Sequence, residues 1–157
     1  MHEQIKEARD YAEAIVDTIH ESIIILDEHF FVKSANKAFY KNFHTTEQDT
    51  IGVLLFDLGN KHWDIPGLRN LMEDIIVKNS RFYDYEITHK FPVIGKKVML
   101  LNASRLLQKS KGEQLILLAI HDITEARAKA LELQKIEKDL LKKDIKISGY
   151  LHAGTYD

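Results

Sequence analysis

Apolar residues recur with a helical period at both ends of the chain. From Ile5 to Ile19 they are spaced three and four residues apart, which predicts an amphipathic helix over residues 1–20. The same spacing over residues 125–147 predicts a coiled-coil helix. Its seam consists of Ala126, Lys129, Leu133, Ile136, Leu140, Lys143 and Ile147. Two lysines in the seam predict a marginally stable parallel pair, and a solvated single helix is the alternative.

The middle of the chain carries two groups of strand patterns. Residues 22–32 contain two β-rich runs around a polar turn, which predicts a hairpin. Three more strands are predicted over residues 82–89, 97–107 and 115–121, because turn residues separate them. The last run is apolar throughout, so we expect it to be central in a sheet or covered.

Polar residues mark the starts of two predicted internal helices. Ser34 or Asn36 can cap a short helix that buries Phe39. Asp64 can cap a longer helix that has proline in its first turn and runs to about Lys78. Strands in groups of two and three, separated by helices, predict an α+β fold with one five-stranded antiparallel sheet and helices on one face.

Composition excludes several classes of protein. The 157 residues suffice for one domain with extra helices, and a hydrophobic content of 45% can build a core. A net charge of −2 gives no general attraction to nucleic acid or to a membrane surface. No apolar run approaches the roughly 20 residues of a membrane span. We therefore expect a cytoplasmic fragment that contacts neither nucleic acid nor membrane.

The tripeptide Asp122-Ile123-Thr124 joins the last predicted strand to the C-terminal helix. Asp122 or Thr124 can accept backbone N–H groups of the first helical turn and complement its positive dipole end. Such a cap has a structural role in any protein. A buried strand that runs directly into a departing helix also suits the transmission of a signal.

These segments together resemble a PAS sensor domain over roughly residues 14–124. The resemblance rests on the element order, on Ser-Ala-Asn-Lys-Ala-Phe at residues 34–39 and on Asp-Ile-Thr at residues 122–124. Residues 58–66 and 91–103 are more specific and resemble a PAS subgroup of bacterial and archaeal signalling proteins. We therefore identify a sensor domain over residues 21–124, a signalling helix and a tail over residues 148–157, where Ser148-Gly149 predicts a helix end.

The resemblance implies a regulatory module that is not itself an enzyme. It implies a homodimer formed through the flanking helices and control of an output domain, of histidine kinase or diguanylate cyclase type. It implies that Asn36 makes structural polar contacts and that Asp122, Ile123 and Thr124 relay the signal. A constitutive dimerisation module with a filled core is the alternative.

Cofactors known from PAS relatives can be tested against the residue types present. The chain contains no cysteine, which excludes cysteine-adduct flavin and coumarate photochemistry and a zinc–cysteine site. The predicted helix that ends near Lys78 has no histidine, which disfavours haem. The eight histidines show no metal-ligand spacing, so no metal is expected.

The family implies a cleft between sheet and helices that holds a small molecule or nothing. The candidates for its lining are His62, Trp63, Tyr83, Tyr85 and Arg105. Core packing is the alternative for the aromatic residues. Arg105, in an otherwise apolar strand, can either meet an anionic ligand or pair with Asp84 or Glu86 across the sheet.

Overall fold

The computed structural model describes residues 7, 8, 10, 11, 14, 15, 20–107, 112 and 114–155. Two compact units share the chain, Met1–Asp122 and Ile123–Asp157. The predicted N-terminal helix over residues 1–20 lies mostly outside the described residues.

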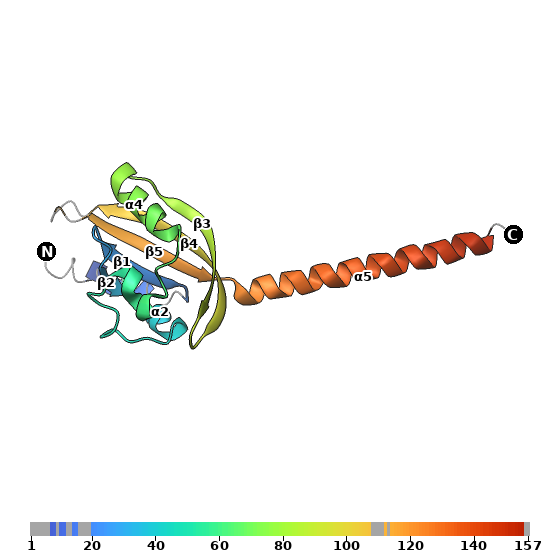
Figure 1. Ribbon diagram of the computed structural model, residues 1–157, viewed down its shortest axis with the longest axis horizontal. Coiled ribbons are helices and arrows are strands. Elements are labelled where there is room, and N and C mark those ends of the chain that lie inside the picture. Colours follow the sequence, from blue (N-terminus) through green and yellow to red (C-terminus); the bar gives the residue numbers. More distant parts are fainter. Residues whose placement is uncertain are drawn as a thin grey trace. The chain divides into compact units, whose positions relative to one another are not determined.

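One five-stranded antiparallel sheet forms the first unit (Figure 1). Its strands are β1 (Ser22–Asp27), β2 (Val32–Ala35), β3 (Phe82–Phe91), β4 (Gly95–Leu107) and β5 (Gln114–Asp122). Their order across the sheet is β2-β1-β5-β4-β3. This arrangement confirms the predicted fold class and the central position of the last strand.

Strand β5 is central because both of its faces carry apolar side chains. It pairs with β1, where Leu118 lies opposite Ile24, and with β4, where Ile120 lies opposite Leu101. These four side chains are buried on one face of the sheet, which we call the inner face. Strand β5 therefore joins the early hairpin to the later strands.

Helical segments cover the inner face. They are α2 (Lys37–Asn42), the 3-10 turn η1 (Leu55–Asp57), α3 (Leu58–Lys61) and α4 (Leu68–Lys78). Figure 1 shows α2 and α4 on the same side of the sheet. Phe39 of α2 and Leu68, Met72 and Ile75 of α4 are fully or almost fully buried in the same core as the inner-face strand residues.

Asn36 caps α2 and also ties this helix to the sheet. Its Oδ1 accepts hydrogen bonds from the N–H groups of Phe39 and Ile23, both at 3.0 Å, and its Nδ2 donates to the Glu21 carbonyl at 2.8 Å. Ser34, the other predicted cap, lies in β2 instead. One buried amide thus satisfies backbone groups of two elements, the structural role that the sequence implied for Asn36.

The predicted start of α4 is wrong. The helix begins at Leu68 after Gly67, which has a φ of 88° and no side-chain cap. Asp64 instead contacts the Arg69 guanidinium at 3.3 Å. A Cβ atom on Gly67 would lie 2.9 Å from the Tyr85 hydroxyl, so this turn requires glycine for both its backbone angle and its packing.

A β-bulge in β3 breaks the alternation predicted for residues 82–89. Phe82 lies opposite Ala103 and Tyr85 opposite Leu101, so β3 has one extra residue there. Asp84 has a φ of 54°, and its N–H donates to Asn102 Oδ1 at 2.9 Å. The bulge places both Phe82 and Tyr85 against the core and leaves Tyr83 63% exposed.

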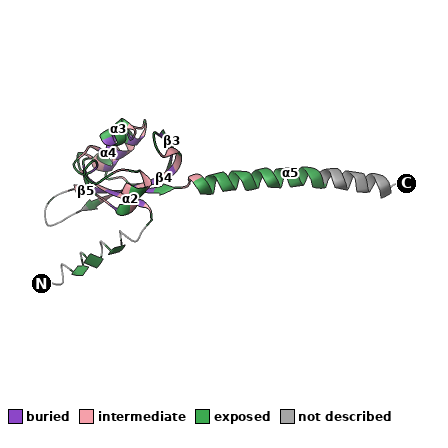
Figure 2. Cartoon of the chain, turned by 90° about the horizontal axis from the view of Figure 1, so that it is seen from below, coloured by how far each residue is buried: buried purple, intermediate pink, exposed green. Residues whose placement is uncertain are grey.

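Helix α5 (Thr124–Thr155) forms the described part of the second unit. The end predicted near Ile147 is wrong, because the helix continues through Ser148 and Gly149. Glycine lowers helix stability by about 1 kcal/mol relative to alanine, which a long helix can tolerate. Figure 2 shows α5 as exposed at nearly all of the residues whose burial is described.

Replacement of Asn36 by alanine should lower the free energy of unfolding by about 2–4 kcal/mol, because it removes a helix cap and leaves partly buried backbone groups unpaired. Urea unfolding of the intact chain measures this loss. Asn70→Ala is the matched control, since Asn70 is exposed within α4 and should change stability by less than about 0.5 kcal/mol. Equal effects of the two substitutions would contradict the role assigned to Asn36.

Candidate functional site

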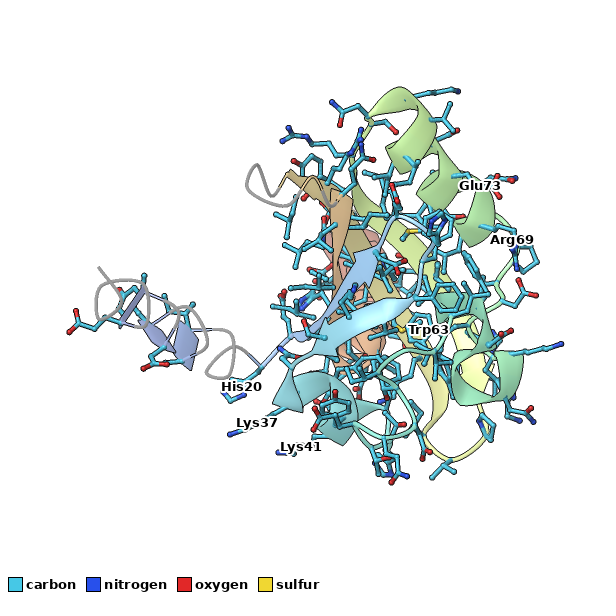
Figure 3. The ribbon with its side chains drawn as sticks, turned by 90° about the vertical axis from the view of Figure 1, so that its left-hand side faces the viewer. His20, Lys37, Lys41, Trp63, Arg69 and Glu73 are labelled. Carbon is cyan, nitrogen blue, oxygen red and sulfur yellow. The ribbon has the colours of Figure 1, made fainter. Side chains whose placement is uncertain are left out.

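A cavity of about 200 Å³ opens between α2, the segment that contains α3, and the turn that joins β3 to β4. Four aromatic side chains form much of its wall: Phe39, Phe43, Trp63 and Phe91. Phe43 makes edge contacts with both Trp63 and Phe91, with ring centres 5.2 and 5.5 Å apart. Figure 3 places Trp63 among the packed side chains of the domain.

The remaining wall is mainly aliphatic, with polar groups from one loop. Leu58 and Gly59 come from α3, and Pro92, Val93 and Ile94 come from the turn after β3. The polar residues are His44, Thr45 and Thr50, and among the described residues no lysine, arginine, aspartate or glutamate lines the cavity. The Thr50 hydroxyl donates to the Thr46 carbonyl at 2.7 Å, and its oxygen lies 3.5 Å from the Thr45 hydroxyl, which can donate to it.

Of the five residues predicted to line a pocket, Trp63 lines this cavity. Tyr83 does not, because the bulge turns it to the surface, where the Arg81 guanidinium donates to its hydroxyl at 3.2 Å. Tyr85 packs beside Phe82 and Gly67. The phenylalanines of the wall escaped the sequence analysis, because their spacing is also that of an ordinary core.

Arg105 lies away from the cavity, near the end of β4. Its Nη1 donates to Asn79 Oδ1 at 3.4 Å, and its buried Nε has no hydrogen-bond partner among the described residues. The register places Glu86 opposite Leu100, and the Asp84 N–H bonds to Asn102. The strand register therefore does not support the predicted pairing of Arg105 with either carboxylate.

His62 and His89 form a contact behind the aromatic wall. His62 follows α3 and precedes Trp63 in the chain, and His89 lies on β3. His62 Nδ1 and His89 Nε2 are 3.1 Å apart, and the His89 ring meets the Phe91 ring edge-on at 4.8 Å. Burial, together with the neighbouring His62, lowers the pKa of His89 below its usual value.

The end of β5 is held by charged residues on both sides. His121 Nδ1 lies 2.9 Å from Glu21, which precedes β1, and Asp122 lies 3.1 Å from the Lys97 ammonium of β4. The Ile123 carbonyl accepts the first helical hydrogen bond, from the Arg127 N–H at 2.8 Å. Ile123 is thus the N-cap position and Thr124 the first helical residue, and capping by Asp122 or Thr124 side chains stays a prediction.

The predicted dimer seam lies on exposed positions of α5. Leu133, Ile136 and Leu140 are 64%, 48% and 54% exposed. The side chain of Ile147, the fourth apolar seam position, falls outside the described residues. An apolar stripe of this kind has no partner within a single helix, so it suits contact with a second helix.

The described residues contain neither a metal-ligand cluster nor a membrane-spanning helix. Among them, no three or more histidine, aspartate or glutamate side chains come together as metal ligands. No helix in that part of the chain combines the length and the apolar character that crossing a membrane requires.

Comparison with known proteins supports the fold. A family model described as PAS fold matches residues 16–128. No curated protein matches the chain significantly. The PAS domain of an HTR-like protein from Haloarcula marismortui is 17% identical, has a TM-score of 0.57, and the match covers 78% of this chain and 97% of that chain.

Two further solved structures give the same result. The PAS domain of BvgS from Bordetella pertussis is 12% identical with a TM-score of 0.57, and the match covers 85% of this chain and 98% of that one. A sensory box sensor histidine kinase from Vibrio cholerae is 13% identical with a TM-score of 0.54, with 78% and 97% covered. At such identities the likeness supports the fold.

Proposed function

We propose that this chain, which belongs to the PAS fold family, is a sensory module that binds a small ligand or a partner and relays the change through α5 to an output domain. PAS domains are typical of signal-transduction proteins and are not themselves catalytic. The proposed output domain is of histidine kinase or diguanylate cyclase type, and the proposed active form is a homodimer in the cytoplasm.

The observation that carries this proposal is the direct connection between β5 and α5. Strand β5 is the central strand of the sheet, and Ile123 is the only residue between its last residue and the first residue of α5. A shift of β5 along its neighbours changes the paired contacts of His121 and Asp122. Because a packed sheet has discrete arrangements, such a shift suits a two-state signal.

The cavity supports the sensory function over the alternative, a ligand-free dimerisation module. A module that only dimerises has no need of an open space beside its core, whereas this domain keeps about 200 Å³ next to Trp63 and Phe91. Space of this size suits a ligand whose presence changes how α3 and the turn after β3 pack on the sheet.

The seam of α5 should hold two copies of the chain together. Replacement of both Leu133 and Leu140 by aspartate should weaken self-association at least about tenfold, because it places charge in an apolar contact. The matched control replaces Leu131 and Leu141, which have similar exposure but lie off the seam. Sedimentation equilibrium measures the dissociation constants, and equal effects of the two double variants would remove the seam from the mechanism.

Filling the mouth of the cavity should change how the α5 helices pair. Val93 lines the cavity and Val77 of α4 does not, although each is 79% exposed. In a chain that carries Ile136→Cys as its only cysteine, Val93→Trp should change the rate of disulfide formation between two copies by at least about twofold, and Val77→Trp should not. Non-reducing gels give the rates. The same rate in both variants would favour the constitutive dimerisation module.

A further inference from the structure

We infer that the cavity takes a small, uncharged aromatic molecule with a hydrogen-bond donor; this inference rests on the proposed sensory function. The first argument is size. A cavity of about 150 Å³ lined by apolar side chains holds one benzene ring, so the space of about 200 Å³ found here suits one ring with a small substituent. A larger ligand would require the wall to move.

The second argument is the chemistry of the wall. Phe39, Phe43, Trp63 and Phe91 present ring edges and faces, which favour offset or edge-to-face contact with another ring. Within the part of the chain that the structure describes, the cavity lining holds no lysine, arginine, aspartate or glutamate to compensate a charged ligand. A carboxylate or ammonium group would therefore lose its hydration without an ionic partner.

The third argument concerns the polar loop. Thr50 is fully buried, and its hydroxyl hydrogen is used by the Thr46 carbonyl. The Thr50 oxygen accepts in turn from the Thr45 hydroxyl at 3.5 Å. Thr45 lines the cavity and is partly exposed, so its oxygen offers the ligand an acceptor, which suits a phenolic O–H or an indole-type N–H. A ring that carries a donor can use this oxygen, whereas an apolar ring cannot.

Three one-ring probes test this inference at pH 8: phenol, benzoate and benzylamine. The resonance of the Trp63 indole, the only tryptophan in the chain, reports binding by NMR. Phenol should shift this resonance with a dissociation constant at least about tenfold lower than the constants of the two charged probes. Val93→Phe, which adds no second indole, should weaken the binding of phenol, and Val77→Phe should leave it unchanged.

Binding of benzoate or benzylamine as tight as that of phenol would overturn the ligand class, and so would an absence of phenol binding. Phenol binding that survives Val93→Phe would place the site elsewhere and overturn the inference as well. The disulfide experiment on Ile136→Cys uses no ligand, so it tests the proposed sensory function independently of the ligand class.

The contact between His62 and His89 carries a second, independent inference. The ring centres are 5.4 Å apart and the facing nitrogens 3.1 Å apart, which places both nitrogens near the line that joins the ring centres. This is the geometry of a direct N–H···N hydrogen bond, in which one ring donates and the other accepts. We propose that this pair is a proton-sensitive latch that fastens the segment of α3 and Trp63 to β3.

The latch holds with no added proton or with one, and it opens with two. A neutral pair and a singly protonated pair both keep one donor and one acceptor between the rings. When both rings are protonated, two N–H groups face each other without an acceptor, and the two positive charges repel. The segment that it fastens includes Leu58, Gly59 and Trp63 of the cavity wall, so opening loosens that wall.

Charged residues of the surrounding elements lie near the two histidines. Lys97 of β4 lies opposite His89, and its ammonium is paired with Asp122 of β5. Lys61 and Asp64 flank the histidine–tryptophan pair in the chain; Lys61 is exposed, and the Asp64 carboxylate contacts Arg69. Both of these neighbouring carboxylates are thus engaged with other cations, and burial and His62 remain the causes that lower the pKa of His89.

The pH dependence has a definite sign. Burial and His62 lower the pKa of His89 in the folded state, below the value of about 6.5 that it has in the unfolded chain. The folded state therefore binds fewer protons than the unfolded state as the pH falls below about 6.5, and the contribution of this group to stability is lost in that range.

A pH titration of the histidine ring resonances by NMR tests the latch in the intact chain. His89 should titrate below the usual histidine pKa, and the Trp63 indole resonance should move with that step. In His62→Ala the pKa of His89 should rise and the response of Trp63 at that step should disappear. His29→Gln, at an exposed histidine in the turn after β1, should change neither result.

Titration of His89 near the usual histidine pKa would overturn the latch, and so would a Trp63 resonance that does not move with the His89 step. If His62→Ala fails to fold, His89→Gln replaces it, with the pH response of the Trp63 indole resonance as the readout. A contact that stays closed in every protonation state would leave the Trp63 resonance in place as the pH falls.

Discussion

The pairing of β5 with both β1 and β4 is the constraint on which the rest of this domain depends. It connects segments that are about one hundred residues apart in the sequence, and it completes the inner face on which α2 and α4 pack. A strand in this position cannot shift without a change in two ladders of hydrogen bonds. Because a single residue separates α5 from β5, the C-terminal helix begins directly after the most constrained strand of the sheet.

The cavity and the histidine pair share this framework. Phe91 of β3 lines the cavity and meets His89 edge-on, and His89 lies opposite Lys97, whose ammonium pairs with Asp122 at the end of β5. A ring contact, a cross-strand pair and an ion pair therefore link the cavity wall to the last residue of the central strand. Spatial continuity alone does not measure coupling, so the energetic link belongs to the proposals above.

The sequence predicted the parts of the fold that periodicity controls. The apolar run of β5 and the helical spacing around Met72 gave the sheet and α4, because burial of a continuous face dominates there. Local features were less accessible. A single positive φ at Asp84 reverses the direction of Tyr83, and a glycine turn rather than Asp64 starts α4. Such features depend on backbone angles that no spacing of side chains reveals.

The candidate site could be predicted from the sequence only in part, for a related reason. Trp63 was expected to line a cleft and does so, whereas Phe43 and Phe91 have the same apolar character as core residues. Whether an aromatic side chain fills the core or borders an empty space depends on the packing of several segments at once. The meeting of His62 with His89 across 27 residues is equally invisible before the fold is known.

The bulge in β3 also bears on how copies of this protein can assemble. The two outer strands of the sheet are β2, which has four residues, and β3, which the bulge interrupts at Asp84. Short or irregular edges are poor templates for another strand, so neither edge invites sheet-to-sheet growth into fibres. The sheet is thereby protected from polymerisation of its strands, which would be far less reversible than the helix pairing proposed for α5.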